Sequence, residues 1–368
     1  MTEWTNFSTA LDDVISSEQV GLFSTLVSTK TYDKLDAKNF GFLVEGVRTG
    51  DAVVNMITNP SYNAIPNVSG ANCDITSCDF EPDYEGGNWE IVMAECRYPV
   101  CTRSAPKKFM ALYQKYKAIN PGDSEYDFII EQMSDIISDI LSNSLVAKLF
   151  LSNQDLTETT INGVDGWIEQ WKDGSGQTLE VVNGFDTTDG QAWYEAIIAG
   201  LEKFETGTYK ALADQTAILI DETGARAISN WLNSADNLKG VDCACYDPDG
   251  VTTANRFSPS NLQIAGHKIV PVPYAEMAMQ FDELQNVYGA SDPGGGVEGE
   301  PDGTLIDPVF AVITPLDNNL IGAPADKELE MNESFYDNKD RTYYFDAGYQ
   351  YGAVVASGAY VLITEAGA

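Results

Sequence analysis

Four of the six cysteines form two pairs that share one spacing, Cys73 with Cys78 and Cys96 with Cys101. The residues around them alternate as two β-strands would, on either side of turn-forming residues at 84–88. A hairpin that turns at Gly87 sets Cys73 opposite Cys101 and Cys78 opposite Cys96. Directly opposed Cβ atoms lie about 4.5–5.5 Å apart, a gap that a disulfide bridges after slight adjustment. The pattern therefore predicts two cross-strand cysteine pairs.

Three states of these four thiols are compatible with the sequence. Reduced, partly buried thiols are the simplest state in a protein made in a reducing cytosol, and disulfides would form after release into an oxidising medium. A single zinc ion held by all four thiolates is the third state, because two Cys-x4-Cys pairs are tolerable zinc spacing. Strand alternation opposes zinc, since positions five apart belong to opposite faces of a regular sheet, although Pro82 and Pro99 could interrupt the ladder. Cys243 and Cys245 are too close together for a bridge, and we expect them to pack on a strand.

The remaining chemistry-bearing residues do not assemble into a recognisable catalytic pattern. His267 is the only histidine, and its neighbours place it on a strand, where a structural role is expected rather than a catalytic one. Gly174-Ser175-Gly176 lacks the third glycine and the flanking elements of a dinucleotide fingerprint. Residues 247–250 and 337–340 are acidic, but neither segment fits a calcium loop. We therefore expect neither an enzyme nor a bound cofactor.

The charge of the chain argues against several kinds of partner. Its 368 residues carry 21 Lys and Arg against 56 Asp and Glu, a net charge of −35. Such a surface repels phosphates and anionic lipids, so neither sequence-specific DNA binding nor membrane docking is expected. No stretch approaches eighteen uninterrupted apolar residues, and residues 1–14 lack the features of a secretory signal. Synthesis in the cytosol is the expectation.

The clearest predicted element is a helix from Asp123 to Phe150, about seven turns long. Asp123 or Ser124 can cap its start. One apolar face is predicted, formed by Ile129, Met133, Ile136, Ile140, Ser144 and Leu149. A helix of this length would span a whole domain.

Shorter elements surround this helix. We predict helices at 188–204 and 221–232 and strands at 216–220, 241–246 and 262–272. The first 45 residues hold only two short apolar pieces, 10–15 and 20–27, and no internal repeat is apparent. Residues 309–363 form the most distinctive block: a strand reading TP-x-x-NN-L-x-G at 314–322, two long alternating runs around Asp337–Asp340, and a last buried strand.

The order of these pieces resembles that of tailed-bacteriophage major capsid proteins, which share the Hong Kong 97-type fold. The resemblance extends over nearly the whole chain. Besides the C-terminal block, its motifs are TTINGVDGWI at 159–168, TAILI at 216–220 and I-x-G-x-x-I at 264–269.

The resemblance implies an α+β fold whose parts can be assigned along the chain. These are an N-terminal arm (1–48), an extended β-hairpin loop (49–107), a peripheral domain with a long spine helix (108–157), an axial α/β domain (158–308), peripheral-domain return strands (309–352) and a terminal strand (353–368). The return strands should then pack on the spine helix, which is far away in the sequence.

The function implied by this resemblance is that of a major capsid protein, located in the virion and assembled in the host cytoplasm. Its main partner would be itself, in hexamers and pentamers of an icosahedral shell that encloses double-stranded DNA. Portal, scaffolding and decoration proteins are the other expected partners. Because only about forty residues precede the loop, scaffolding would be a separate protein, or the scaffolding segment is absent from this chain. An encapsulin-like nanocompartment shell remains an alternative, as does an unrelated acidic enzyme or binding protein.

Overall fold

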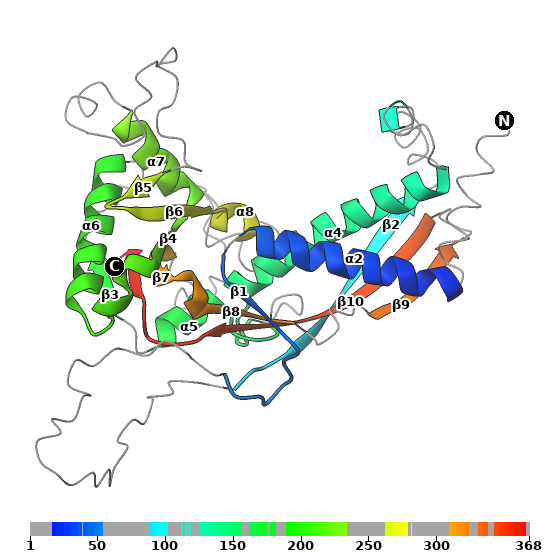
Figure 1. The fold of residues 1–368 in the computed structure, drawn as a ribbon, viewed down its shortest axis with the longest axis horizontal. Coiled ribbons are helices and arrows are strands. Elements are labelled where there is room, and N and C mark those ends of the chain that lie inside the picture. Colours follow the sequence, from blue (N-terminus) through cyan, green and yellow to red (C-terminus); the bar gives the residue numbers. More distant parts are fainter. Residues whose placement is uncertain are drawn as a thin grey trace, which may run out of the picture. The chain divides into compact units, whose positions relative to one another are not determined.

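The chain is a mixed α+β protein with two β-sheets, seen as a ribbon in Figure 1. This computed structural model describes residues 17–38, 40–53, 88–101, 112, 115–116, 118, 125–156, 162–174, 177–181, 189–233, 262–278, 281, 309–323, 330–337 and 342–365. The chain divides into two compact units. Unit 1 comprises Met1–Asp51, Trp89–Ser152 and Ile321–Ala353, and unit 2 comprises Ala52–Asn88, Asn153–Leu320 and Val354–Ala368.

Unit 1 combines two long helices with a five-stranded sheet. The helices are α2 (Ser17–Ala37) and α4 (Glu125–Leu151). The sheet has the order β1-β8-β10-β2, with β9 also paired to β10. Its strands are β1 (Phe42–Glu45), β2 (Val92–Cys101), β8 (Asn319–Ala323), β9 (Glu330–Asp337) and β10 (Thr342–Val355).

The predicted long helix is confirmed as α4, but its predicted apolar face is partly wrong. Ile140 is 39% exposed, whereas Ile137, Leu141 and Leu145 are buried. The buried surface also includes three serines at four-residue spacing, Ser134, Ser138 and Ser142. Side chains of this polar row are covered by α2, which lies along α4 (Figure 1). The buried face is therefore wider and more polar than apolar periodicity alone indicates.

The N-terminal region also differs from its prediction of short apolar pieces. Residues 17–37 form one helix of 21 residues, and its buried side chains include Val27, Tyr32 and Leu35. A helix of this length is stabilised mainly by packing of one face, and that face lies on α4 of the same chain. The wider segmentation into arm, loop and domains stays a prediction.

The long hairpin predicted in the C-terminal block is confirmed. Strands β9 and β10 are antiparallel, with Asp337 opposite Thr342 and an irregularity between Phe345 and Ala347. The turn residues 338–341 lie outside the described part of the chain. The last predicted strand is β11 (Val361–Glu365), which belongs to the sheet of unit 2.

Unit 2 is built around a six-stranded mixed sheet of order β3-β11-β7-β4-β6-β5. Strand β4 pairs parallel with β6 and antiparallel with β7. The strands are β3 (Gln177–Val181), β4 (Thr216–Asp221), β5 (Gln263–Ile264), β6 (His267–Val272), β7 (Val309–Pro315) and β11. The main helices are α5 (Trp167–Asp173), α6 (Gly190–Thr206), α7 (Glu222–Leu232) and α8 (Tyr274–Ala278). Short 3-10 helices lie at Lys210–Gln215 and Leu316–Asn318.

Helices α6 and α7 begin where the sequence predicts. Asp189 caps α6 by accepting a hydrogen bond from the Gln191 backbone N–H, and Asp221 caps α7 through Thr223 N–H. Each cap satisfies one of the backbone donors left open in a first helical turn. The predicted strand at 216–220 is confirmed as β4, whereas the predicted strand at 241–246 lies outside the described residues.

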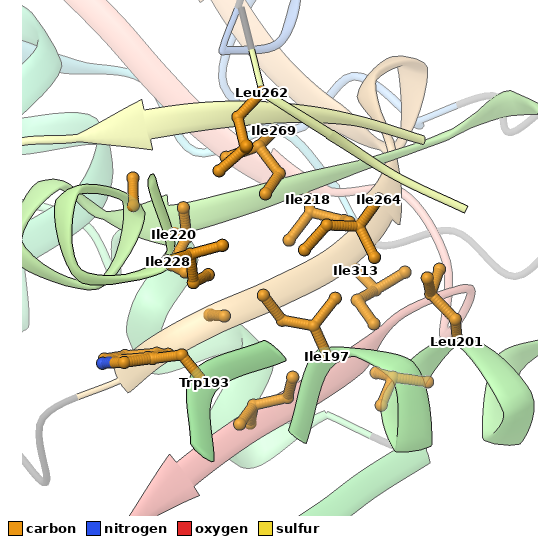
Figure 2. Packing of buried hydrophobic residues seen from close by; sticks show 14 of the residues in the cluster. Trp193, Ile197, Leu201, Ile218, Ile220, Ile228, Leu262, Ile264, Ile269 and Ile313 are labelled. Carbon is orange, nitrogen blue, oxygen red and sulfur yellow. The ribbon is translucent and has the colours of Figure 1, made fainter. Parts of the chain in front are cut away.

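The core of unit 2 lies between these helices and one face of the sheet. Figure 2 shows Ile197 of α6 pointing toward Ile218 and Ile313 on β4 and β7, with Trp193 at one end of the cluster. All four side chains are at most 1% exposed. Burial of a large aliphatic side chain contributes about 1.5–3 kcal/mol, so this cluster stabilises unit 2 substantially.

The predicted strand at 262–272 is wrong in one respect, because it is a hairpin. Strands β5 and β6 pair antiparallel, with Ile264 opposite His267. The two residues between them have φ angles of +50° at Ala265 and +90° at Gly266. Two positive φ values in a row are typical of a type I′ turn, for which Asn-Gly is preferred. Alanine at the first position hides this turn from sequence analysis.

None of the helices in the described part of the chain is long and apolar enough to cross a membrane.

Replacing Ala265 by Asn should stabilise unit 2 by about 1 kcal/mol, because the left-handed region is strained for alanine and tolerated by asparagine. The measurement is the midpoint of urea-induced unfolding. The matched variant Gly266→Ala should lower the midpoint. An unchanged or lower midpoint for Ala265→Asn would contradict a strained turn.

Candidate functional site

The cysteine-bearing strand predicted around Cys96 and Cys101 exists, and its observed partner is β10. Strand β2 pairs antiparallel with β10, setting Cys96 opposite Ala347 and Cys101 opposite Thr342. Among the described strands, β2 pairs with β10 alone. Cys73 and Cys78 lie outside the described residues, so the structure does not bring the four cysteines together. The two cross-strand pairs stay a prediction.

The ladder of β2 runs without interruption through Pro99. Ten consecutive positions are paired, including Pro99 opposite Tyr344, with no shift of register. Proline has no N–H to donate to a ladder, so it is tolerated in a strand where its nitrogen faces away from the paired neighbour. Positions 96 and 101 therefore keep opposite parity, which places them on opposite faces of the strand. This regularity removes one of the two interruptions that a four-cysteine zinc site would need.

Two backbone hydrogen bonds join residues 50–51 to Trp89, which lies just before β2. The backbone N–H of Gly50 donates to the carbonyl oxygen of Trp89 at 2.8 Å, and the Trp89 N–H donates to Asp51 at 2.8 Å. Trp89 is 3% exposed. A Cβ atom added at Gly322 would lie 2.7 Å from its ring, and one added at Gly352 would lie 3.3 Å from it. Gly322 therefore leaves room for the indole ring, whereas at Gly352 the closer atoms are Ile91 Cδ1 at 2.7 Å and the Glu90 carbonyl oxygen at 2.8 Å.

His267 has the structural role that the sequence predicts. It begins β6, and its Nδ1 lies 2.8 Å from the Thr216 hydroxyl oxygen. The Thr216 hydroxyl donates to the Ala213 carbonyl oxygen at 2.8 Å. Since that hydroxyl has one proton, it accepts from His267, and Nδ1 carries the imidazole hydrogen. The ring links β6 to β4 rather than facing a nucleophile.

The acidic residues considered as cation ligands do not form a site in the described structure. Within the described ranges, no group of three or more His, Cys, Asp or Glu side chains could hold a metal ion. Residues 247–250 lie outside those ranges, and Asp337 ends β9. The described part of the chain forms a framework of packed helices and strands.

The central feature of that framework is the contact between α4 and β10. Ser144 shares a hydrogen bond with the Tyr349 hydroxyl at 3.1 Å, and Ser152 shares one with Tyr351 at 3.2 Å. The ammonium of Lys148 lies 5.3 Å from the centre of the Tyr349 ring and 5.8 Å from that of Tyr351. Cations within about 6 Å of an aromatic ring are attracted to its face. The predicted packing on the long helix is thereby confirmed for β10, one of the predicted return strands.

The spacing of these residues explains the fit. Residues 144, 148 and 152 are four apart and follow one face at the end of α4. Tyr349 and Tyr351 are two apart and point from the same face of β10. The side chains at four-residue spacing along the helix therefore face the two tyrosines at two-residue spacing on the strand. Sequence analysis named Ser144 but missed Lys148 and Ser152, because neither belongs to an apolar pattern.

Burial shifts the acid–base behaviour of two tyrosines in unit 1. Tyr32 of α2 donates its hydroxyl hydrogen to the Gln350 carbonyl oxygen at 2.9 Å. Desolvation raises the pKa of Tyr32 far above its usual value, and it also raises the pKa of Tyr351. For Tyr351 the hydrogen bond with Ser152 acts in the opposite direction. Both phenols stay neutral where they pack.

Comparison with known proteins gives a likeness in solved structures alone, since no protein-family model and no curated protein sequence matches the chain. The similar solved structures include phage capsids and procapsids. A structure from Gordonia phage Cozz is 13% identical and covers 91% of this chain and 86% of its own, with a TM-score of 0.45. A satellite phage P4 procapsid is 10% identical, with coverages of 91% and 97% and a TM-score of 0.46. The capsid of a native GTA particle is 13% identical, with coverages of 90% and 90% and a TM-score of 0.45.

Alkaline pH should destabilise unit 1 through its buried tyrosines. A folded-state pKa above the unfolded value of about 10 gives stability that is complete below pH 10 and is lost as pH rises further. For Tyr32 the loss should reach about 1 kcal/mol by pH 11. Urea unfolding at pH 8, 9, 10 and 11 measures it. Tyr32→Phe should lose less between pH 9 and 11 than the unsubstituted protein, and equal losses would contradict this origin.

Proposed function

We propose that this chain is a major capsid protein, which assembles with copies of itself into an icosahedral head shell around double-stranded DNA. The observation that carries this proposal is the contact of β10 with α4. A long helix backed by strands that return from the far end of the chain is the arrangement implied by the capsid resemblance of the sequence. An enzyme of unrelated fold would give no reason for this order of elements.

The second unit supports the same proposal. Strand β4 contains the motif at 216–220 and is followed directly by α7. The hairpin β5–β6 contains the motif at 264–269. The elements therefore follow one another as in the implied axial α/β domain. The assignment of residues 1–48 as an arm and 49–107 as an extended loop belongs to the proposal as well.

In this proposal the function is mechanical rather than chemical. Helix α4 acts as a stiff element of 27 residues, about 40 Å long at 1.5 Å per residue. Contacts between subunits hold the shell, in closed symmetric rings of six and five. A net charge of −35 suits a shell that confines DNA without binding its phosphates. Portal, scaffolding and decoration proteins would be its other partners, with assembly in the host cytoplasm.

The mass and content of the expressed protein test this proposal. Light scattering after size-exclusion chromatography should find particles of megadalton mass, whereas a monomer near 40.1 kDa under all conditions tried would contradict a coat role. For particles purified from infected cells, nuclease-resistant DNA is expected inside. Particles that instead enclose a protein cargo and no DNA would point to the nanocompartment alternative.

We further propose that the four loop cysteines reinforce the mature particle as two cross-strand disulfides, Cys73–Cys101 and Cys78–Cys96. The uninterrupted ladder of β2 supports separate pairs over a single zinc site, because Cys96 and Cys101 occupy positions of opposite parity. Formation requires an oxidising medium, so the thiols would be reduced during assembly in the cytosol.

Non-reducing peptide mapping of purified particles checks this pairing. Peptides linked as 73–101 and 78–96 are expected, and Cys101→Ser should leave Cys73 available for alkylation. Cys243→Ser is the matched control and should leave both linked peptides unchanged. Six alkylatable thiols in every particle, or one zinc ion per chain by elemental analysis, would contradict the proposal.

A further inference from the structure

Helices α2 and α4 are joined by a repeated polar contact that apolar periodicity does not reveal. Along α4 the sequence repeats a serine followed by Asp or Asn every four residues, at 134–135, 138–139 and 142–143. Along α2 a lysine recurs at the same interval, at Lys30, Lys34 and Lys38, the last lying one residue beyond the helix.

The two repeats meet in register. Lys30 Nζ donates to Ser134 Oγ at 2.9 Å and to Asp135 Oδ1 at 2.7 Å. Lys34 Nζ donates to Ser138 Oγ at 2.8 Å and lies 2.7 Å from Asp139 Oδ1. Lys38 Nζ donates to the Asn143 side-chain oxygen at 2.5 Å.

The lysine ladder, defined as Lys30, Lys34 and Lys38 with these partners, fixes how the helices lie. Its residues on α2 and α4 are separated by a constant 105 positions, for Lys30 with Asp135 and for Lys38 with Asn143. A constant separation means that the helices run in the same direction. Each lysine therefore faces the next pair of serine and Asp or Asn, one helical turn further on.

The face of α4 beneath the ladder keeps its hydrogen bonds without α2. Ser134, Ser138 and Ser142 each donate a hydroxyl hydrogen to the carbonyl oxygen three residues earlier, at 2.8, 3.0 and 3.1 Å. The carboxylates are already partly hydrated, since the Asp135 side chain is 42% exposed and that of Asp139 is 63% exposed. Departure of α2 would therefore leave no buried charge and no orphaned hydroxyl on this face.

Other contacts of α2 do not depend on charge. Val27 and Leu35 are buried, and Tyr32 donates to the Gln350 carbonyl oxygen. Just beyond the helix, the rings of Phe40 and Phe150 meet edge to face at 5.5 Å. These contacts keep α2 in place in the folded state. The ladder adds a contribution that salt can weaken, because partly exposed ion pairs are screened by dissolved ions.

We propose that the lysine ladder is an electrostatic latch, through which ionic strength sets how often α2 opens from α4 while the rest of unit 1 stays folded. In many proteins a single helix or strand opens at a lower free energy than that of global unfolding. Lys38 is the weakest step, because burial lowers its pKa and its direct partner is a neutral amide. The latch belongs to the folded subunit and does not depend on the proposed capsid role.

Hydrogen exchange with mass spectrometry on the full chain tests the latch. Amides of α2 should exchange about 2- to 30-fold faster in 1 M than in 0.05 M sodium chloride, the effect of losing two ion pairs of 0.2–1 kcal/mol each. Amides of α7 in unit 2 are the internal reference and should not change. Equal rates for α2 at both salt concentrations would overturn the proposal, and so would α2 and α4 accelerating by the same factor.

Variants separate the ladder from general salt effects. The double variant Lys30→Gln/Lys34→Gln should exchange faster at low salt and should lose the salt dependence of α2. Asn143→Asp supplies a third carboxylate, so it should slow exchange at low salt and steepen the salt dependence. Arg226→Gln removes the surface ion pair with Glu222 on α7 and should leave α2 unchanged. A double variant that keeps the full salt dependence would contradict the ladder as its source.

Discussion

The contact of α4 with two segments far from it in the sequence is the interaction on which unit 1 depends. Helix α4 is 27 residues long, and a helix in a protein gains most of its stability from packing of one face rather than from its own hydrogen bonds. Helix α2 covers one side of it, and β10 approaches it through Tyr349 and Tyr351. Both contacts cross more than 100 positions of sequence. The side chains of α4 are therefore covered by segments that lie far away along the chain.

The polar character of these contacts has a consequence for specificity. Hydrogen bonds need specific partners at specific distances, so they add directional contacts to the apolar packing. Two serines of α4 accept hydrogen bonds from lysines of α2. Ser144 of α4, and Ser152 just beyond it, share hydrogen bonds with tyrosine hydroxyls of β10. Each such bond contributes about 0.5–1.5 kcal/mol net, which is modest for stability. Their combined effect is to favour the observed contacts of α2 and β10 with α4.

Local patterns predicted much of this fold, and contacts at a distance limited the rest. Helix α4, the strand–helix pair at 216–232 and the hairpin β9–β10 follow from periodicity and capping residues. The covering of Ser134 and Ser138 by α2 could not be read from apolar periodicity, because serines interrupt an apolar face unless their partner is known. The turn at Ala265 was missed because alanine carries no turn signal.

For the candidate site as well, the sequence predicted the local structure but not the long-range partner. Sequence parity placed Cys96 and Cys101 on a strand, and β2 bears that out, but the partner on its observed side, β10, is more than 240 positions away. Parity and spacing describe one strand at a time and cannot choose its neighbour. The proposed assembly role rests on the order of all elements together rather than on any single residue.

Negative-stain electron microscopy of the expressed chain tests the proposed shell role. We expect closed, roughly spherical shells of uniform diameter, because a capsid subunit would reach its full set of contacts only among copies of itself. Fields of small separate particles at every protein and salt concentration would contradict it.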